Sequence, residues 1–165
     1  MDMKIVDATV DMCRDLAQVK RQVWETTYRG IYPDSKLDGF DVDKEAEKFA
    51  RLAISADINL YGIVAEDNLI GYMAWGKNPR YPDGDSNEIV LLSILKDYQG
   101  KGIGGQVFEY AKCKLQEKGD HFTLYCNKYN LLAQAFYEKM GCKAISVDED
   151  NPDKSIPQIK YIYRF

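Results

Sequence analysis

The chain has 165 residues, of which 45% are apolar and 29% are charged, and its formal net charge is −4. This is the composition of a globular protein long enough to bury one proper core, so we expect a single domain over residues 1–165. Lys and Arg are scattered along the chain, which disfavours a nucleic-acid partner. The four cysteines form no CxxC pair and the single histidine is His121, so no metal site is expected.

The chain shows no targeting or membrane segment by its pattern. Its first dozen residues contain no apolar core of a signal peptide, and no run approaches the 18 or more apolar residues of a membrane span. We therefore expect a cytoplasmic protein with no membrane association and with unpaired thiols.

The first third of the chain predicts a strand followed by two amphipathic helices. Residues 4–8 read as a short strand, after which Thr9 is expected to cap a helix. Apolar side chains at spacings of three to four residues mark its buried stripe: Met12, Leu16, Val19 and Val23. Gly30 and Pro33 end this helix, and a second amphipathic helix is expected over residues 42–54.

The middle of the chain predicts strands. Two β-rich runs, 59–66 and 69–77, flank the dipeptide Asp67-Asn68, which indicates an antiparallel hairpin. Residues 78–87 are rich in turn formers. The run 88–95 is almost continuously apolar, as expected of a strand covered on both faces.

A glycine turn and two further helices complete the pattern. Four of the eight residues 98–105, "YQGKGIGG", are glycine, and a helix is expected to start there with Ile103, Val107, Ala111 and Leu115 buried. A strand over 121–126 and a helix from Asn130 to Gly141 precede two final strands. The order β-α-α-β-β-β-α-β-α-β-β predicts a mixed, mostly antiparallel α/β sheet with a central strand–glycine turn–helix unit.

The glycine turn indicates an anion site, because a strand that enters a helix through glycines leaves the first helical N–H groups open. It is not the GxxxxGK[ST] of nucleotide hydrolases. Gly100, Gly102 and Gly105 do fit the GxGxxG spacing, but the strand comes late and no acidic residue ends the next strand. By itself the turn leaves open a phosphate site or a glycine-rich helix start without a ligand.

Two separated motifs resemble those of the GNAT acetyltransferase superfamily. "QGKGIG" is similar to that family's Gln/Arg-x-x-Gly-x-Gly/Ala pattern, and "NKYNLLAQAFYEKMGC" is similar to its second motif. The order of elements along the whole chain resembles the family as well. One departure is Lys96, where many members carry proline, and this affects only the geometry of the connector.

The resemblance implies the GNAT fold and acetyl-CoA as cosubstrate, held between strands 88–95 and 121–126. It implies that backbone groups of the first strand pair with the pantetheine and that the amides of residues 99–105 hold the pyrophosphate. The implied cofactor-binding residues are Leu92, Ser93, Ile94, Gln99, Gly100, Lys101, Gly102, Ile103, Gly104, Gly105, Asn130 and Phe136. Asn130 is equally interpreted as a helix N-cap.

The resemblance also implies the catalytic residues. Tyr137 matches the family's general acid, since a phenol stays protonated at neutral pH; the alternative is that it only packs beside Phe136. Glu88 is the candidate general base, directly or through water, and the alternative is an exposed strand-end carboxylate or a chain of waters in its place. Cys126 is interpreted as a buried strand cysteine rather than a nucleophile, because His121 lies five residues earlier on the opposite face.

The acceptor wall is predicted in the first helical region. Trp24, Tyr28 and Tyr32 are the candidate substrate-binding residues, although Trp24 equally suits an anchor of the helix on the sheet. Weaker candidates are Tyr72, Trp75 and Tyr81. If the acidic loops with Asp83, Asp85, Asp148, Glu149, Asp150 and Asp153 border the pocket, they favour a cationic amine.

The sequence thus predicts an acetyl-CoA-dependent N-acetyltransferase that acts on a small-molecule primary amine by direct attack. The alternatives are a peptide or protein N-acetyltransferase, a non-catalytic acyl-CoA-binding sensor and, more remotely, a dinucleotide oxidoreductase. Whether the protein forms a homodimer, which amine it uses and which acyl chain it prefers are left open.

Overall fold

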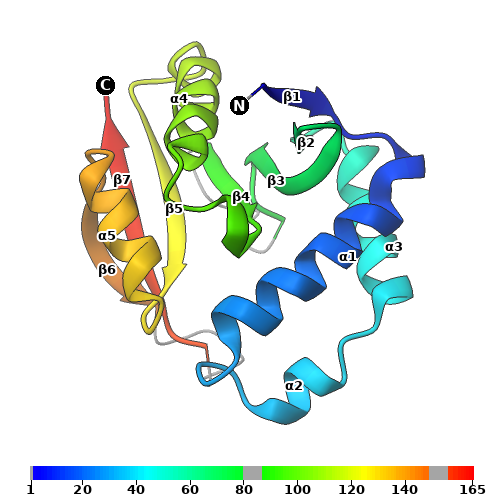
Figure 1. Ribbon diagram of the computed structural model, residues 1–165. Helices are drawn as coiled ribbons and strands as arrows, with labels where there is room; N and C mark the ends of the chain where they lie inside the picture. The colour runs from blue at the N-terminus through cyan, green and yellow to red at the C-terminus, as the bar shows by residue number, and fades with distance from the viewer. Residues whose placement is uncertain (1, 80–86, 149–155) are drawn as a thin grey trace.

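The computed structural model describes residues 2–79, 87–148 and 156–165, which form one seven-stranded sheet with helices around it (Figure 1). The strand order is β1-β2-β3-β4-β5-β7-β6, and every neighbouring pair is antiparallel except β4–β5. The strands are β1 (Met3–Asp7), β2 (Ile58–Ala65), β3 (Asn68–Gly76), β4 (Glu88–Ile94), β5 (His121–Asn127), β6 (Lys143–Asp148) and β7 (Gln158–Arg164). The predicted mixed and mostly antiparallel sheet is confirmed.

The helical elements match the expected ones and add to them. They are η1 (Val10–Met12), α1 (Cys13–Val23), η2 (Trp24–Tyr28), α2 (Asp34–Asp38), α3 (Val42–Ala53), η3 (Lys96–Tyr98), α4 (Ile103–Gln116) and α5 (Leu131–Lys139). The short helix α2, which lies between Pro33 and Gly39, was not expected, so the predicted order lacks one element. Proline before a helix and glycine after it are normal boundaries, and the sequence reasoning used Pro33 only as a breaker.

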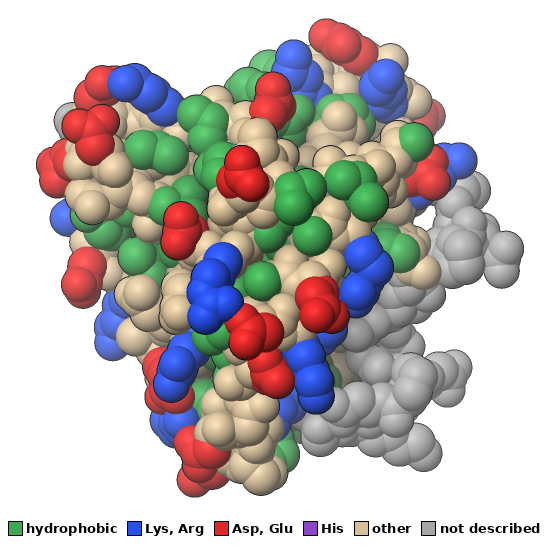
Figure 2. Space-filling view, turned by 90° about the vertical axis from the view of Figure 1, so that its right-hand side faces the viewer, with side chains coloured by type: hydrophobic (Ala, Val, Ile, Leu, Met, Phe, Trp, Pro, Cys, Tyr) green, Lys and Arg blue, Asp and Glu red, His purple; other side chains and the backbone are tan. Residues whose placement is uncertain are grey.

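One core cluster lies between the sheet and the pair α1–α3. Leu16, Val19 and Val23 of α1 are buried there against Phe49 of α3 and side chains of β2 and β3. The predicted stripe is therefore confirmed, although Met12 is only partly buried. The Thr9 side chain makes no capping hydrogen bond, because the chain enters α1 through the short helix η1 instead. Figure 2 shows the surface of this side of the molecule, where acidic and basic side chains are interspersed.

A second core cluster lies under α4 and α5, which flank β5 (Figure 1). All four predicted residues of α4 are at most 3% exposed: Ile103, Val107, Ala111 and Leu115. Phe108 packs on Phe122 of β5 with ring centroids 5.9 Å apart. Gly141 ends α5 with a φ of 95°, the left-handed conformation expected of a residue after a helix. The two clusters cover opposite faces of the sheet, as the continuously apolar β4 predicted.

The β2–β3 hairpin turns one residue earlier than predicted. Glu66 and Asp67 are the two loop residues, with φ of 51° and 62°, and Asn68 already pairs with Ala65. Positive φ at both central residues is the signature of a type I′ turn, whose twist matches that of the flanking strands. The two loop residues of the hairpin are therefore Glu66 and Asp67, one position earlier than the predicted Asp67-Asn68.

Candidate active site

The site begins where two parallel strands separate. β4 and β5 pair only through Glu88 with Thr123 and Ile89 with Leu124, at the start of β4. On its other side β4 carries a bulge: Trp75 pairs with Ile89 and Ala74 with Leu91, so Val90 is the extra residue. A bulge bends a strand and increases its local twist. β4 therefore turns away from β5 at Val90, and the predicted segment Leu92–Ile94 lies along the separated part.

The glycine turn opens the start of α4. Gly100 and Gly102 have φ of 72° and 82°, and Gly102 is the N-cap residue, so no side chain caps the helix. The N–H of Gln106 donates to Gly102 O over 3.2 Å, which leaves the preceding amides of the first turn outside the helical ladder. The first turn contains no acidic residue. An anion is the partner that these amides and the helix dipole favour.

The residues of this turn divide into open and packed positions. A Cβ added at Gly100, Gly102 or Gly105 would meet nothing within 4 Å, so these positions are bare toward a ligand. A Cβ at Gly104 would lie 3.4 Å from Cε2 of Phe136, so this glycine serves the packing of α4 on α5. The sequence could not separate these two roles, because a glycine letter carries no directional information.

The side chains beside the glycines are already engaged. The amide nitrogen of Gln99 donates to Ile94 O over 2.8 Å, which ties the turn to the end of β4. The Lys101 ammonium lies 5.3 Å from the ring centroid of Tyr98. Backbone amides rather than the Gln99 side chain are therefore the groups that the turn presents.

Tyr137 of α5 is a buried phenol, 8% exposed, in the core cluster under α4 and α5. Its ring contacts those of Phe108, Phe136 and Tyr161, with centroids 6.4, 5.3 and 6.2 Å apart. Burial raises the pKa of Tyr137, and nearby Cys126, Tyr28 and Cys142 raise it further. The hydroxyl is consequently protonated at neutral pH, as a proton donor requires. Packing and proton donation, the two interpretations of this residue, are compatible.

Asn130 caps the start of α5. Its side-chain oxygen accepts from the N–H of Ala133 over 3.1 Å, so it is the N-cap of α5. Burial raises the pKa of Tyr28, and the Asn130 side chain opposes this shift. The interpretation of Asn130 as a helix cap is therefore confirmed.

Glu88 is buried at the β4–β5 junction, with 5% of its surface exposed. Its Oε1 accepts from the side-chain nitrogen of Asn78 over 3.1 Å. Burial raises the pKa of Glu88, against the opposing influence of Asn78 and the positive charge of Lys160. The interpretation of an exposed strand-end carboxylate is wrong. Sequence reasoning missed Asn78 and Lys160, because no local pattern indicates their approach to Glu88.

The predicted aromatic wall exists and contains one more member. Tyr28 and Tyr32 stack with centroids 4.5 Å apart and an interplanar angle of 5°. Trp24 meets the edge of Tyr28 at 6.2 Å and that of Tyr32 at 5.3 Å. Phe40, which the sequence did not single out, lies 5.3 Å from Trp24. The ammonium of Lys36 lies 4.7 Å from the Tyr32 centroid, so a cation already occupies part of this wall.

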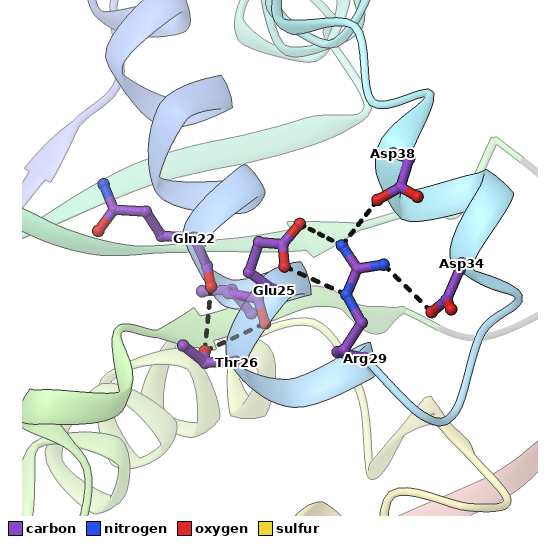
Figure 3. A network of polar contacts seen from close by, with 7 residues as sticks. Gln22, Glu25, Thr26, Arg29, Asp34 and Asp38 are labelled. Atoms are coloured by element: carbon purple, nitrogen blue, oxygen red, sulfur yellow. Dashed lines mark hydrogen bonds and ion pairs between the residues drawn. The ribbon is translucent and has the colours of Figure 1, made fainter.

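A network around Arg29 fixes this wall (Figure 3). The guanidinium donates to both carboxylate oxygens of Glu25, at 3.2 and 2.6 Å, and to Asp34 and Asp38 at 3.1 and 3.0 Å. Arg29 thereby joins η2 to α2. Within the π-helical turn η2, the Thr26 hydroxyl donates to Gln22 O over 3.0 Å, which satisfies a carbonyl near the irregular turn.

The remaining candidates take structural positions. Cys126 is buried, and burial raises the pKa of its thiol to about 12, which agrees with a strand cysteine that is not a nucleophile. Tyr72 and Trp75 belong to the two core clusters. Asp148 is the last residue of β6. The other candidates lie outside the described residues: Tyr81, Asp83, Asp85, Glu149, Asp150 and Asp153.

In residues 2–79, 87–148 and 156–165, no group of three or more His, Cys, Asp or Glu side chains is arranged to hold a metal ion. Over the same part of the chain, no helix is long and apolar enough to cross a membrane.

Separated parallel strands, an uncapped start of α4 and a buried phenol on α5 fit an acetyltransferase of the α/β class. The chain belongs to the acetyltransferase (GNAT) family, whose model matches residues 20–142. A spermidine N(1)-acetyltransferase of Thermoplasma acidophilum is 25% identical over 154 residues, which cover 90% of this chain and 92% of the relative.

Solved structures share the fold over the full chain. The PaiA N-acetyltransferase of Thermoplasma acidophilum, determined in complex with coenzyme A, superposes with a TM-score of 0.82 at 23% identity, covering 100% of both chains. An acetyltransferase of Thermus thermophilus has a TM-score of 0.76 at 17% identity, covering 100% of this chain and 98% of the other. The GNAT fold expected from the two sequence motifs is confirmed.

Proposed function

We propose that this protein is an acetyl-CoA-dependent N-acetyltransferase that transfers the acetyl group to a primary amine of a small-molecule acceptor. The observation that carries the proposal is one buried, protonated phenol, Tyr137, whose ring contacts Phe136, the side chain that packs on Gly104 at the open start of α4. An acyl-CoA-binding sensor would need the helix start but has no use for a proton donor beside it.

The residues present fit acetyl-CoA. Gly100, Gly102 and Gly105 are open, and the amides at the start of α4 are suited to a diphosphate. The separated part of β4, which contains Leu92, Ser93 and Ile94, offers backbone groups to which an extended amide chain can add like a strand. When bound, acetyl-CoA supplies the activated acyl carbon. All other steps belong to the residues of this chain.

Two residues divide the proton transfers. The acceptor amine must be neutral to attack, so Glu88, with its raised pKa, takes the proton directly or through water. Tyr137 donates a proton to the departing thiolate, which balances the proton that the amine loses. A phenol and a carboxylate whose environments keep one protonated and allow the other to ionise are a workable acid–base pair.

The acceptor class is proposed from the relative and from the wall. The Thermoplasma relative is named as a spermidine acetyltransferase, and an aliphatic amine suits a wall of aromatic rings. The ammonium of Lys36 lies 4.7 Å from the Tyr32 centroid, a contact of the kind that an alkylammonium acceptor would make with these rings. We therefore place amines of the polyamine type first among the acceptors.

A thiol-release assay with acetyl-CoA and a panel of polyamines, aminoglycosides, amino acids and peptides tests this function. We expect turnover with small amines, and we expect Tyr137→Phe to lower kcat by roughly a hundredfold or more while CoA affinity, measured by calorimetry, is unchanged. Tyr110→Phe on α4 is the matched control, since its ring packs on Tyr61 away from the site. Tight CoA binding without transfer to any member of the panel would favour the sensor instead.

A further inference from the structure

Two rings of the acceptor wall contact an ammonium group that belongs to the protein itself. The ammonium of Lys36 lies 4.7 Å from the ring centroid of Tyr32 and 5.8 Å from that of Trp24. The two rings are inclined at 64° with centroids 5.3 Å apart. Lys20 also lies 5.3 Å from Trp24, but its ammonium is bound to Glu45 over 2.6 Å. Trp24 and Tyr32, called here the ring pair, therefore have the geometry of an ammonium-binding subsite.

The ring pair and the helix that carries Lys36 are both held in place. Tyr28 stacks on Tyr32 with centroids 4.5 Å apart. The ion pairs of Arg29 join α2 to η2 (Figure 3), and Leu37 anchors α2 in the core. The Lys36 side chain is a flexible four-carbon stem. It can therefore leave the rings by rotation of its own bonds, while α2 stays folded.

The charges around the ring pair favour a cation. Residues 24–38 contain three carboxylates, those of Glu25, Asp34 and Asp38, against two cations, Arg29 and Lys36. Arg29 is bound to all three carboxylates. The segment keeps a negative balance even with Lys36 included, so a further ammonium group is attracted to it.

The chemistry of the rings determines which amino group of an acceptor they can hold. The attacking amine must be neutral, whereas an aromatic face attracts the protonated form. The ring pair is therefore unsuited to the reacting nitrogen and suited to a second, charged amino group of the same molecule. We propose that the ring pair binds the non-reacting ammonium of a polyamine acceptor, which takes the place of Lys36. The inference rests on the proposed function and adds that the acceptor carries two amino groups.

Kinetics with two matched acceptors test the subsite. Putrescine and n-butylamine share the butyl chain and differ in the second amino group, so kcat/KM is expected to favour putrescine. Tyr32→Leu is expected to reduce this preference by roughly tenfold. Lys36→Met removes the competing ammonium and is expected to lower the KM of putrescine by roughly threefold to tenfold.

Lys44→Met is the matched control, because it removes an exposed lysine of α3 and should leave the KM of putrescine unchanged. Equal kcat/KM for the two amines would overturn the inference, as would a KM of putrescine that is the same in Lys36→Met and the wild type. Thermal unfolding verifies that each variant is folded.

Nuclear magnetic resonance measures the displacement of Lys36 without acetyl transfer. Ring currents shift protons that lie over an aromatic face upfield, so the ε-methylene protons of Lys36 are expected upfield of those of the exposed Lys44. Spermidine, added together with CoA, which carries no acetyl group, is expected to move the Lys36 resonance toward the Lys44 value. Lys36→Met assigns the resonance.

The outcomes separate this inference from the proposed function. A Lys36 resonance that stays in place while calorimetry shows bound spermidine would refute the displacement and leave the proposed function intact, and a protein that binds no spermidine would also refute it. A displaced Lys36 in a protein that transfers no acetyl group would refute the proposed function alone.

Discussion

At the scale of single residues, burial suits the two acid–base candidates to opposite roles: one is a proton donor and the other a proton acceptor. It keeps the Tyr137 phenol protonated, and it raises the pKa of the Glu88 carboxyl, which makes that carboxylate a stronger base. Asn78 and Lys160 oppose the second effect, since both favour the ionised carboxylate. The side chains that shift the pKa of Tyr137 and of Glu88 include residues of elements other than α5 and β4.

Glu88→Gln tests the base through the pH dependence of activity. The carboxylate is the active form, so kcat/KM of the wild type is expected to rise with pH through the pKa of Glu88, above the ordinary value of about 4.3. In Glu88→Gln, kcat/KM is expected to lose this rise with pH, and its value on the plateau is expected to be roughly a hundredfold lower. A variant that keeps both the plateau and the acidic limb would show that water and backbone groups deprotonate the amine without Glu88.

The same substitution makes a prediction for stability. Because the folded-state pKa of Glu88 is raised, its favourable contribution is complete below the unfolded pKa of about 4.3 and is lost as the pH rises through the folded value. At neutral pH the glutamine variant, which keeps an oxygen for Asn78, is therefore expected to be no less stable than the wild type. Chemical denaturation at pH 4 and pH 7 measures the difference.

At the scale of elements, a substitution at the start of α4 is expected to affect folding stability and CoA binding in opposite ways. Gly105 lies in the first turn with no positive φ, and an added Cβ meets nothing within 4 Å. Gly105→Ala is expected to stabilise the protein by about 0.5–1 kcal/mol, since alanine favours the helix, while it weakens CoA binding through crowding of the open amides. Denaturation and calorimetry report the two effects, and unchanged CoA affinity would mean that the diphosphate lies elsewhere.

The pair α1–α3 contains a buried ionic contact that the amphipathic pattern did not predict. Glu45 is 8% exposed and its carboxylate receives Lys20 and Lys48, each at 2.6 Å. The Lys20 ammonium also lies 5.3 Å from the Trp24 ring centroid. Although burial opposes ionisation, these two lysines hold the pKa of Glu45 below its usual value. The contact supports α1, which continues into η2 and its aromatic side chains Trp24 and Tyr28.

Glu45→Gln is expected to lower the free energy of unfolding by about 2 kcal/mol, because it leaves the half-buried Lys20 without a counter-ion. The loss is expected at neutral pH and to vanish as the pH falls through the folded pKa of Glu45, where the wild type loses the same interaction. Glu109→Gln, which breaks the exposed 2.7 Å pair with Lys112, is the matched control and should cost under about 1 kcal/mol. Equal losses of unfolding free energy in the two variants would mean that the Glu45 contact contributes no more than an exposed ion pair.

At the scale of the whole molecule, the sheet consists of two parts joined weakly at β4–β5. Among the residues that the structure describes, the β4–β5 ladder has two residue pairs, Glu88 with Thr123 and Ile89 with Leu124, before the strands separate at Val90. A cosubstrate in this gap would contact both parts. CoA at a hundredfold excess over its Kd is then expected to add about 2.7 kcal/mol to the free energy of unfolding.

Hydrogen exchange with and without CoA measures where that stabilisation acts. Slower exchange is expected in the separated part of β4 and in residues 99–105, but not in β2, which has antiparallel neighbours on both sides. Protection spread evenly over the sheet, or confined to β1 and β2, would place the ligand outside the gap.

The sequence by itself determined the periodic helices, the apolar strand β4, the open glycine turn and the residues of both GNAT motifs. Those signals are local: helical spacing, glycine conformation and capping by Asn130 depend on neighbours within a turn or two. Only the tertiary structure decided that Glu88 is buried beside Asn78 and that Gly104 faces Phe136. The reason is physical. These contacts join segments far apart in the chain, and they form only where packing of the helices on a bulged, separating strand pair brings the segments together.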